Sequence, residues 1–180
     1  MKFTGMGIGE VLLIEPEVRE DRRGFFTEWY REDVFAQNGL PVKFVQDNHS
    51  RSARGVLRGL HYQIPPKAQD KLVRVVRGSA FDVAVDIRKG SKTFGRTVTV
   101  TLSAGNRRML FIPKGFAHGF LALEEGTEFL YKVSDFYSPA DERGIFWKDP
   151  ALAIAWPKLD IDYLLSDKDQ KYPTLQNAVL

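Results

Sequence analysis

RGLHYQIPPKAQDKLVRVVRGSAFDVAVD, Arg58 to Asp86, is the stretch that decides the fold. Pro65 and Pro66 exclude a continuous helix, because proline removes a backbone donor and pushes the residue before it into extended backbone. Gly78 then separates two strand-like runs. In the second run, Phe81 to Ile87, apolar residues alternate with polar or small ones, the period-two pattern of a half-buried strand. We therefore expect neighbouring strands here, with Asp82 and Asp86 on one face.

Short strand-like runs separated by glycine-containing turns continue on both sides of that stretch. They are Val11 to Ile14, Phe25 to Tyr30, Lys43 to Asn48, Thr97 to Leu102, Met109 to Pro113, Gly119 to Leu123 and Thr127 to Val133. Their spacing is typical of an all-β sandwich or barrel. One helix is expected at Arg31 to Gln37, ended by Asn38 and Gly39. After Pro139 the pattern predicts loops and one or two short helices.

The composition indicates one globular domain over residues 1–180. The 180 residues are 43% hydrophobic, enough for a substantial core. The 26 basic and 23 acidic residues give a net charge of +3 with scattered bases, so a small anionic ligand is favoured over a nucleic acid. Cysteine is absent, which excludes a thiol nucleophile. The sequence has no apolar signal core and no run that could cross a bilayer, and we expect a cytoplasmic protein without a membrane partner.

Three histidines, His49, His61 and His118, are the candidate metal ligands or catalytic bases. A metal site in a barrel needs three or four nitrogen and carboxylate ligands, and His61 has no second histidine two residues away, so we expect no metal. Composition alone would make His61 a core histidine. Its neighbours Arg58 and Lys71, together with Asp82, favour a catalytic role instead.

Other candidates have a plain structural alternative beside the functional one. Pro113, Gly115 and His118 have the P-x-G-x-x-H spacing, which is similar to the second cupin motif and predicts a tight turn that delivers the imidazole into a barrel. Tyr131 shares a strand face with two apolar residues and could be a core tyrosine. Asp169 stands three residues after a serine, the spacing of a helix-capping box. Residues 21–26, DRRGFF, could hold a phosphate and stack a base, or form a charged hairpin turn.

Many separate segments, in order along nearly the whole chain, resemble the dTDP-4-dehydrorhamnose 3,5-epimerase family of cupin-type sugar-nucleotide enzymes. The segments are DRRGFFTE (Asp21 to Glu28), FVQDNHS (Phe44 to Ser50), GVLRGLHYQ (Gly55 to Gln63), DKLVRVVRG, FDVAVDIRKGSKTFG, FIPKGFAHGF, YKVSDFYSP (Tyr131 to Pro139) and LSDKD. The resemblance implies a jelly-roll barrel and a homodimer that uses no metal and no cofactor. It also implies inversion at C3 and C5 of a dTDP-4-keto-6-deoxyhexose, in dTDP-rhamnose biosynthesis.

The resemblance assigns the catalytic roles residue by residue. It makes His61 the general base, Asp169 the carboxylate that orients it, Tyr131 the acid on the opposite face of the sugar, and Lys71 the cation beside the enolate oxygen. The nearby Asp167 is the alternative to Asp169. These residue types suit the chemistry, because inverting a carbon next to a ketone needs a base and an acid on either side of the ring and a donor at the oxygen.

The resemblance also assigns substrate-binding residues. His118 would line the same pocket, and Arg58 would meet the pyrophosphate with Gln46 and Asn48 nearby. The nucleotide would be held by Arg23, Phe26 and Glu28, reaching across from a partner subunit, and Tyr137 would contact the substrate. Strict alternation places Arg58 and His61 on opposite faces of their strand. A bulge at Gly59 would turn both inward.

Three other functions fit parts of this pattern. The first is a related enzyme that inverts one centre of a dTDP-4-keto-deoxysugar, which needs nearly the same residues. The second is a non-catalytic cupin that binds a sugar nucleotide, for which the combination of His61, Lys71, Tyr131 and Asp169 is unnecessary. The third is a metal-dependent cupin oxygenase or isomerase, which would require a bound metal for activity.

Overall fold

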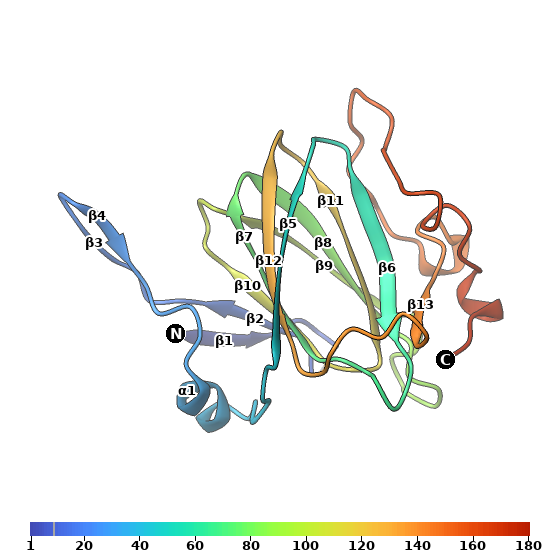
Figure 1. The fold of residues 1–180 in the computed structure, drawn as a ribbon, viewed down its shortest axis with the longest axis horizontal. Helices are drawn as coiled ribbons and strands as arrows, with labels where there is room; N and C mark the ends of the chain where they lie inside the picture. Colours follow the sequence, from blue (N-terminus) through green and yellow to red (C-terminus); the bar gives the residue numbers. More distant parts are fainter. Residues whose placement is uncertain (9) are drawn as a thin grey trace.

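Two antiparallel sheets form the body of the protein in a computed structural model that describes residues 1–8 and 10–180 (Figure 1). The six-stranded sheet has the order β1 (Lys2–Gly5), β2 (Leu12–Glu15), β10 (Met109–Ile112), β7 (Lys71–Arg77), β12 (Thr127–Val133) and β5 (Gln46–Ser52). The five-stranded sheet has the order β13 (Glu142–Gly144), β6 (Leu57–Gln63), β11 (Phe116–Ala122), β8 (Ser79–Asp86) and β9 (Thr97–Ser103). The predicted all-β, cupin-like jelly roll is confirmed.

A small hairpin stands away from the two sheets, at the left of Figure 1. It consists of β3 (Arg19–Asp21) and β4 (Gly24–Phe26), and all six strand residues are exposed. The strand expected over Phe25 to Tyr30 is therefore wrong beyond Phe26. The expected helix is confirmed as α1 (Glu32–Gln37), and Gly39 follows it at φ 82°, a conformation that glycine adopts without steric cost.

The main core lies between the facing sheets. Apolar side chains from both sheets meet there, and thirteen residues form one buried cluster, which includes Val73, Val75, Leu110, Phe120 and Phe129. The rings of Phe120 and Phe129 stack with their centroids 4.1 Å apart, joining one sheet to the other. Burying such aromatic and aliphatic side chains supplies most of the free energy that holds a sandwich together.

Strand β8 differs from the half-buried strand that its alternation predicts. Asp82 and Asp86 are both fully buried. The apolar face of β8 is also covered, because Val83 and Val85 pack in a second cluster with Ile145, Leu152 and Leu175 from the C-terminal third of the chain. That segment contains the 3-10 helices η1 (Pro150–Leu152) and η2 (Leu175–Asn177), the short helices expected there. The prediction of one solvated face was wrong because the face of Asp82 and Asp86 lies inside the barrel, while a loop-rich segment covers the apolar face.

The predicted bulge in β6 is present at Gly59. Arg58 pairs with Phe120 and His61 pairs with His118, so three steps along β6 match two steps along β11. Gly59 has φ 133°, and a Cβ there would lie 2.5 Å from the Cα of Gly119. Only glycine fits this approach of two backbones. The extra residue changes the alternation, so that Arg58 and His61 reach the same cavity.

Candidate active site

Five polar side chains project into the barrel from five different strands: His61 on β6, Lys71 on β7, Asp82 on β8, His118 on β11 and Tyr131 on β12. Their directions follow from the alternation of each strand. Leu60 and Tyr62, for example, pack in the outer cluster behind the five-stranded sheet, so His61 between them faces inward. The apolar core fills one part of the barrel, and this polar group occupies the rest.

His61 forms a pair with Asp169. The His61 Nε2 atom lies 2.5 Å from Asp169 Oδ1, and Asp169 is only 4% exposed. An ionised carboxylate only accepts hydrogen bonds, so Nε2 carries the proton and Nδ1 is left as the basic atom. Asp167 is exposed, and Asp169 rather than Asp167 is the histidine's partner. The Tyr172 ring packs edge-on against the imidazole at 5.7 Å and further restricts it.

Ser166 and Asp169 have the spacing of a capping box, but no helix follows them in the structure. The Asp169 backbone N–H donates to Ser166 Oγ over 3.2 Å, which is half of a capping box. The segment forms a turn rather than a helix, and the Asp169 side chain points to His61 instead of back to the Ser166 backbone. The local pattern thus builds the turn that presents this carboxylate.

Lys71 is the buried cation of the site. Its ammonium donates to the His61 carbonyl oxygen over 3.3 Å, and the residue is 9% exposed. Burial lowers the pKa of Lys71 to about 8, and the negative charges of Asp82 and Glu142 oppose that decrease. At neutral pH the ammonium form therefore predominates. A proton donor of this kind is suited to an oxygen on which negative charge develops.

His118 and Asp82 form a buried pair beneath the cavity. His118 Nε2 lies 2.9 Å from Asp82 Oδ2. Burial lowers the pKa of His118, although the Asp82 charge opposes the shift, so the imidazole is neutral. His118 also pairs with His61 across β11 and β6. The predicted turn before it is present, since Gly115 has φ 83°.

One cavity of about 380 Å³ brings together most of the residues expected to act on the substrate. Its walls include His61, Lys71, Tyr131, Tyr137, Gln46 and Asn48. Burial raises the pKa of Tyr131 and a nearby Arg58 charge opposes this, so the phenol stays protonated at neutral pH. Tyr131 is thus a cavity residue whose ring also packs on the core, which satisfies both interpretations of its position.

A second cavity of about 370 Å³ adjoins the first through shared walls. It is lined by Arg58 and Asp169 together with Leu164 and Ser166, and it shares His61 and Glu142 with the first cavity. Arg58 is held by Ser52, whose hydroxyl accepts from the guanidinium Nε over 3.1 Å. His61 therefore stands between a cavity that Tyr131 lines and a cavity that Arg58 lines.

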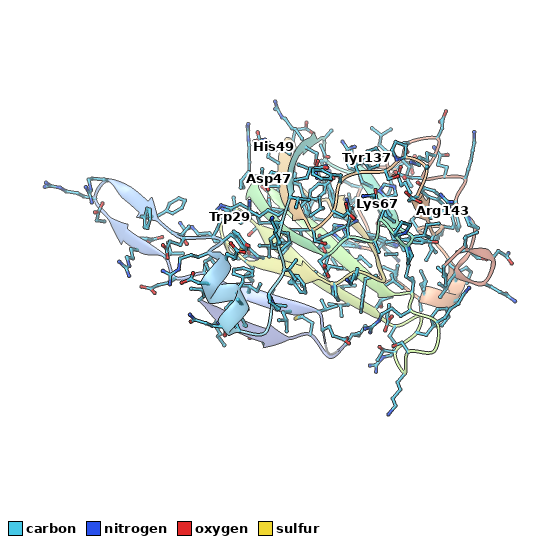
Figure 2. The ribbon with its side chains drawn as sticks, turned by 60° about the horizontal axis from the view of Figure 1, so that its bottom comes forward. Trp29, Asp47, His49, Lys67, Tyr137 and Arg143 are labelled. Carbon is cyan, nitrogen blue, oxygen red and sulfur yellow. The ribbon has the colours of Figure 1, made fainter. Side chains whose placement is uncertain are left out.

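The hairpin residues Arg23, Phe26 and Glu28 are not brought to these cavities. They line two separate hollows, of about 530 and 420 Å³, beside β3 and β4. Figure 2 shows Tyr137, which marks the first cavity, on the side of the molecule away from that hairpin. Within one chain, these three residues cannot contact a molecule bound next to His61.

Glu142, Gln63 and Gln69 line the first cavity without having been predicted. Gln63 stands two residues after His61, so the alternation of β6 was a usable signal for it. Glu142 lies on the three-residue strand β13, in a segment that the sequence pattern assigns to loops. No periodic signal could have identified it.

A jelly-roll barrel with an imidazole, a phenol and an ammonium around one cavity defines a cupin-type enzyme that moves protons. Comparison with known proteins gives the particular family. A family model described as dTDP-4-dehydrorhamnose 3,5-epimerase matches residues 6–177, and the chain belongs to that family.

Three relatives illustrate the similarity. The dTDP-4-dehydrorhamnose 3,5-epimerase of Pseudomonas aeruginosa is 58% identical over 179 residues, covering 99% of this chain and 98% of the relative. The dTDP-4-dehydrorhamnose 3-epimerase of Streptomyces niveus is 43% identical over 179 residues, covering 99% and 86%. A crystal structure of dTDP-6-deoxy-D-glucose-3,5-epimerase from Legionella pneumophila, in complex with dTDP-4-keto-L-rhamnose, has a TM-score of 0.95 and 47% identity, covering 98% and 93%.

Two further findings concern the described residues 1–8 and 10–180. Among them, no group of three or more histidine and acidic side chains is arranged to hold a metal ion. Within the same residues, no helix has the length and apolar character needed to span a membrane.

Proposed function

We propose that this protein is an isomerase that inverts C3 and C5 of dTDP-4-dehydro-6-deoxy-D-glucose, giving dTDP-4-dehydro-L-rhamnose, as a cytoplasmic step of dTDP-rhamnose biosynthesis. The observation that carries this proposal is the shared cavity, in which His61 and Tyr131 stand around the same space with Lys71 buried beside them. The family membership and the relatives described above support it.

The first step of each inversion is removal of a proton next to the C4 carbonyl. His61 Nδ1 takes the proton, and the bonding electrons move to the carbonyl oxygen, giving an enolate. Asp169 stabilises the resulting imidazolium through its bond to Nε2. Lys71 donates to the enolate oxygen, which is the position where a preorganised cation lowers the barrier most.

The second step returns a proton to the other face of the same carbon. Tyr131 donates its phenolic proton, the carbon–carbon double bond of the enolate breaks and the C4 carbonyl re-forms. The carbon is then inverted, with His61 protonated and Tyr131 a phenolate. Both groups must exchange protons with water before the second carbon reacts, and the nucleotide contacts keep the sugar in place meanwhile.

The test of the reaction is direct product analysis. Incubation of the protein with dTDP-4-dehydro-6-deoxy-D-glucose in heavy water, followed by NMR, should show deuterium at C3 and C5 and inversion of both. Inversion at C3 alone would identify the single-centre alternative, which the similarity to the Streptomyces niveus 3-epimerase keeps open. Binding without exchange at either carbon would exclude an epimerase.

Replacing Tyr131 by phenylalanine should separate the two half-reactions. The ring keeps its packing on the core, and only the hydroxyl is lost. Because His61 still removes protons, exchange with heavy water should persist, while inversion at one carbon at least should fall by about 10²-fold or more. NMR of substrate and product measures both rates. Unchanged rates at C3 and C5 would remove Tyr131 as the acid.

We also propose a homodimer in which each hairpin completes the other subunit's site. Phe25 and Phe26 are 56% and 67% exposed, which is unusual for large apolar side chains unless a partner covers them. Arg23, Phe26 and Glu28 are remote from the cavities of their own chain. In a two-fold dimer they would hold the nucleotide for the partner, while Arg58, Gln46 and Asn48 would approach it from the subunit that carries the base.

Mixing two inactive variants should restore activity if the sites are shared. One variant combines Arg23→Ala with Phe26→Ala, and the other is His61→Ala. In a statistical mixture of refolded dimers, half are mixed and each mixed dimer has one complete site, so about one quarter of the wild-type rate should return. Activity measured after co-refolding tests this. No recovery, with both variants folded and dimeric, would contradict shared sites.

A further inference from the structure

Glu142 is a partly buried carboxylate beside the proposed catalytic groups, and the mechanism above gives it no role. Its side chain is 13% exposed. Glu142 Oε2 accepts from the Tyr137 hydroxyl over 2.7 Å, and Lys168 Nζ donates to the same carboxylate. Burial alone would raise the pKa of Glu142, but the hydrogen bonds from Lys168 and Tyr137 bring it below its ordinary value. The carboxylate is therefore charged at neutral pH.

The strand pairing places Glu142 on the same side of the sheet as the base. In the β13–β6 pair, Glu142 is opposite Gln63 and Gly144 is opposite His61. Because Gln63 and His61 are two residues apart on β6, they share one face, and Glu142 joins that face. Glu142 and His61 accordingly line both cavities together.

The two partners of Glu142 come from segments that each carry a group of the proposed mechanism. Tyr137 belongs to the loop that follows β12, the strand of Tyr131. Lys168 immediately precedes Asp169 in the turn that presents the Asp169 carboxylate to His61. One short strand thus connects the wall of the sugar cavity to the turn that orients the base.

We propose that Glu142 is a positioning residue for the epimerisation: its carboxylate ties Tyr137 and the turn with Lys168 and Asp169 together at the wall between the two cavities, and adds a second negative charge beside His61. This inference rests on the proposed function. Tyr137 is then held as a side wall for the sugar, and Asp169 is kept against the imidazole.

The charge part of this inference predicts a specific change with pH. The groups around His61 are Asp169, Glu142, Lys168, Lys71, His118, Arg58, Tyr131 and Tyr172. The Glu142 carboxylate favours the imidazolium, which is the inactive form of the base in the free enzyme. Removing that charge should move the acid limb of kcat/KM to lower pH, and removing the neighbouring Lys168 cation should move it to higher pH.

Three variants separate the charge from the hydrogen bond. Glu142→Gln keeps the size and one acceptor but removes the charge, and the acid limb should shift downward by about half a pH unit or more. Lys168→Met should shift it upward. Tyr137→Phe removes only the hydrogen bond to Glu142, so the limb should stay while KM rises several-fold. Asp160→Asn is the matched control, because Asp160 forms an exposed ion pair with Arg54 and should leave kinetics unchanged.

A second measurement does not depend on turnover. The His61 imidazole can be titrated by NMR in each folded variant, and its midpoint should move in the same directions as the acid limb. A wild-type limb and midpoint in Glu142→Gln, or shifts in the same direction for Glu142→Gln and Lys168→Met, would overturn the inference. Failure of the wild-type protein to convert the 4-keto sugar would instead overturn the proposed function, and this inference with it.

Discussion

Replacing His61 by alanine should stop deuterium entry at both C3 and C5 and reduce kcat by about 10³-fold or more, the upper part of the range for loss of a general base. The structure gives the reason. His61 is the imidazole held by Asp169 at 2.5 Å, and it shares the cavity with Tyr131 and Lys71. Without the imidazole, the base that Asp169 orients is lost, so proton removal fails at both carbons. NMR in heavy water and steady-state kinetics measure these losses.

His49→Ala is the matched control for that variant. His49 lies on the outer face of β5, where its Nε2 is 3.2 Å from Glu128 Oε2 and its side chain is 54% exposed. Its loss should leave exchange and kcat unchanged. Wild-type exchange at either carbon in His61→Ala would show that another group is the base at that carbon.

Replacing Lys71 by methionine should lower kcat by about 10²- to 10³-fold, the usual cost of removing one preorganised donor at a developing oxyanion. Methionine keeps the length and the packing of the buried chain, so the loss reports the ammonium. The same variant should lose a feature of the pH profile. Burial lowers the pKa of Lys71 to about 8, so the ammonium is present below that pH and is lost as the pH rises through it.

Wild-type kcat/KM should therefore decline above about pH 8, and Lys71→Met should show low activity without that decline. Tyr131 does not contribute to this decline, because burial raises the pKa of its phenol and the phenol loses its proton only at still higher pH. Lys2→Met is the control, since the Lys2 side chain is 75% exposed and pairs with Glu15 on the surface. A basic limb that persists in Lys71→Met would assign it to another group.

Much of the fold could be predicted because its strands alternate and its turns contain glycine. The runs around Gly78 and the helix before Gly39 illustrate this, since each rests on interactions between neighbouring residues. The error in the burial of strand β8 has a different origin. The outer face of strand β8 is covered by residues such as Leu152 and Leu175, more than 60 positions further along the chain. The alternation of residues within the strand cannot predict a contact with so distant a segment.

The sequence predicted those parts of the site for which the residue type alone indicates the chemistry, such as the imidazole of His61 and the ammonium group of Lys71. It also predicted the bulge, because glycine permits one. It was ambiguous for Asp169 and Asp167, which differ only in how a turn folds. The prediction could not include Glu142, because the role of that carboxylate depends on how the chain folds to bring Tyr137, five residues before it, and Lys168, 26 residues after it, to the same oxygen. Charge and burial together define such a residue, and sequence shows only the first.

Gly59 and Gly119 touch across β6 and β11 without any side chain between them, and this limits how the enzyme can be redesigned. A Cβ on Gly119 would lie 2.7 Å from the Arg58 carbonyl oxygen, just as one on Gly59 would meet Gly119. Neither position can be enlarged to compensate for the other. Variant libraries that reshape the pocket for a different sugar should keep these two glycines and vary the loops around the entrance, where larger side chains can extend into solvent.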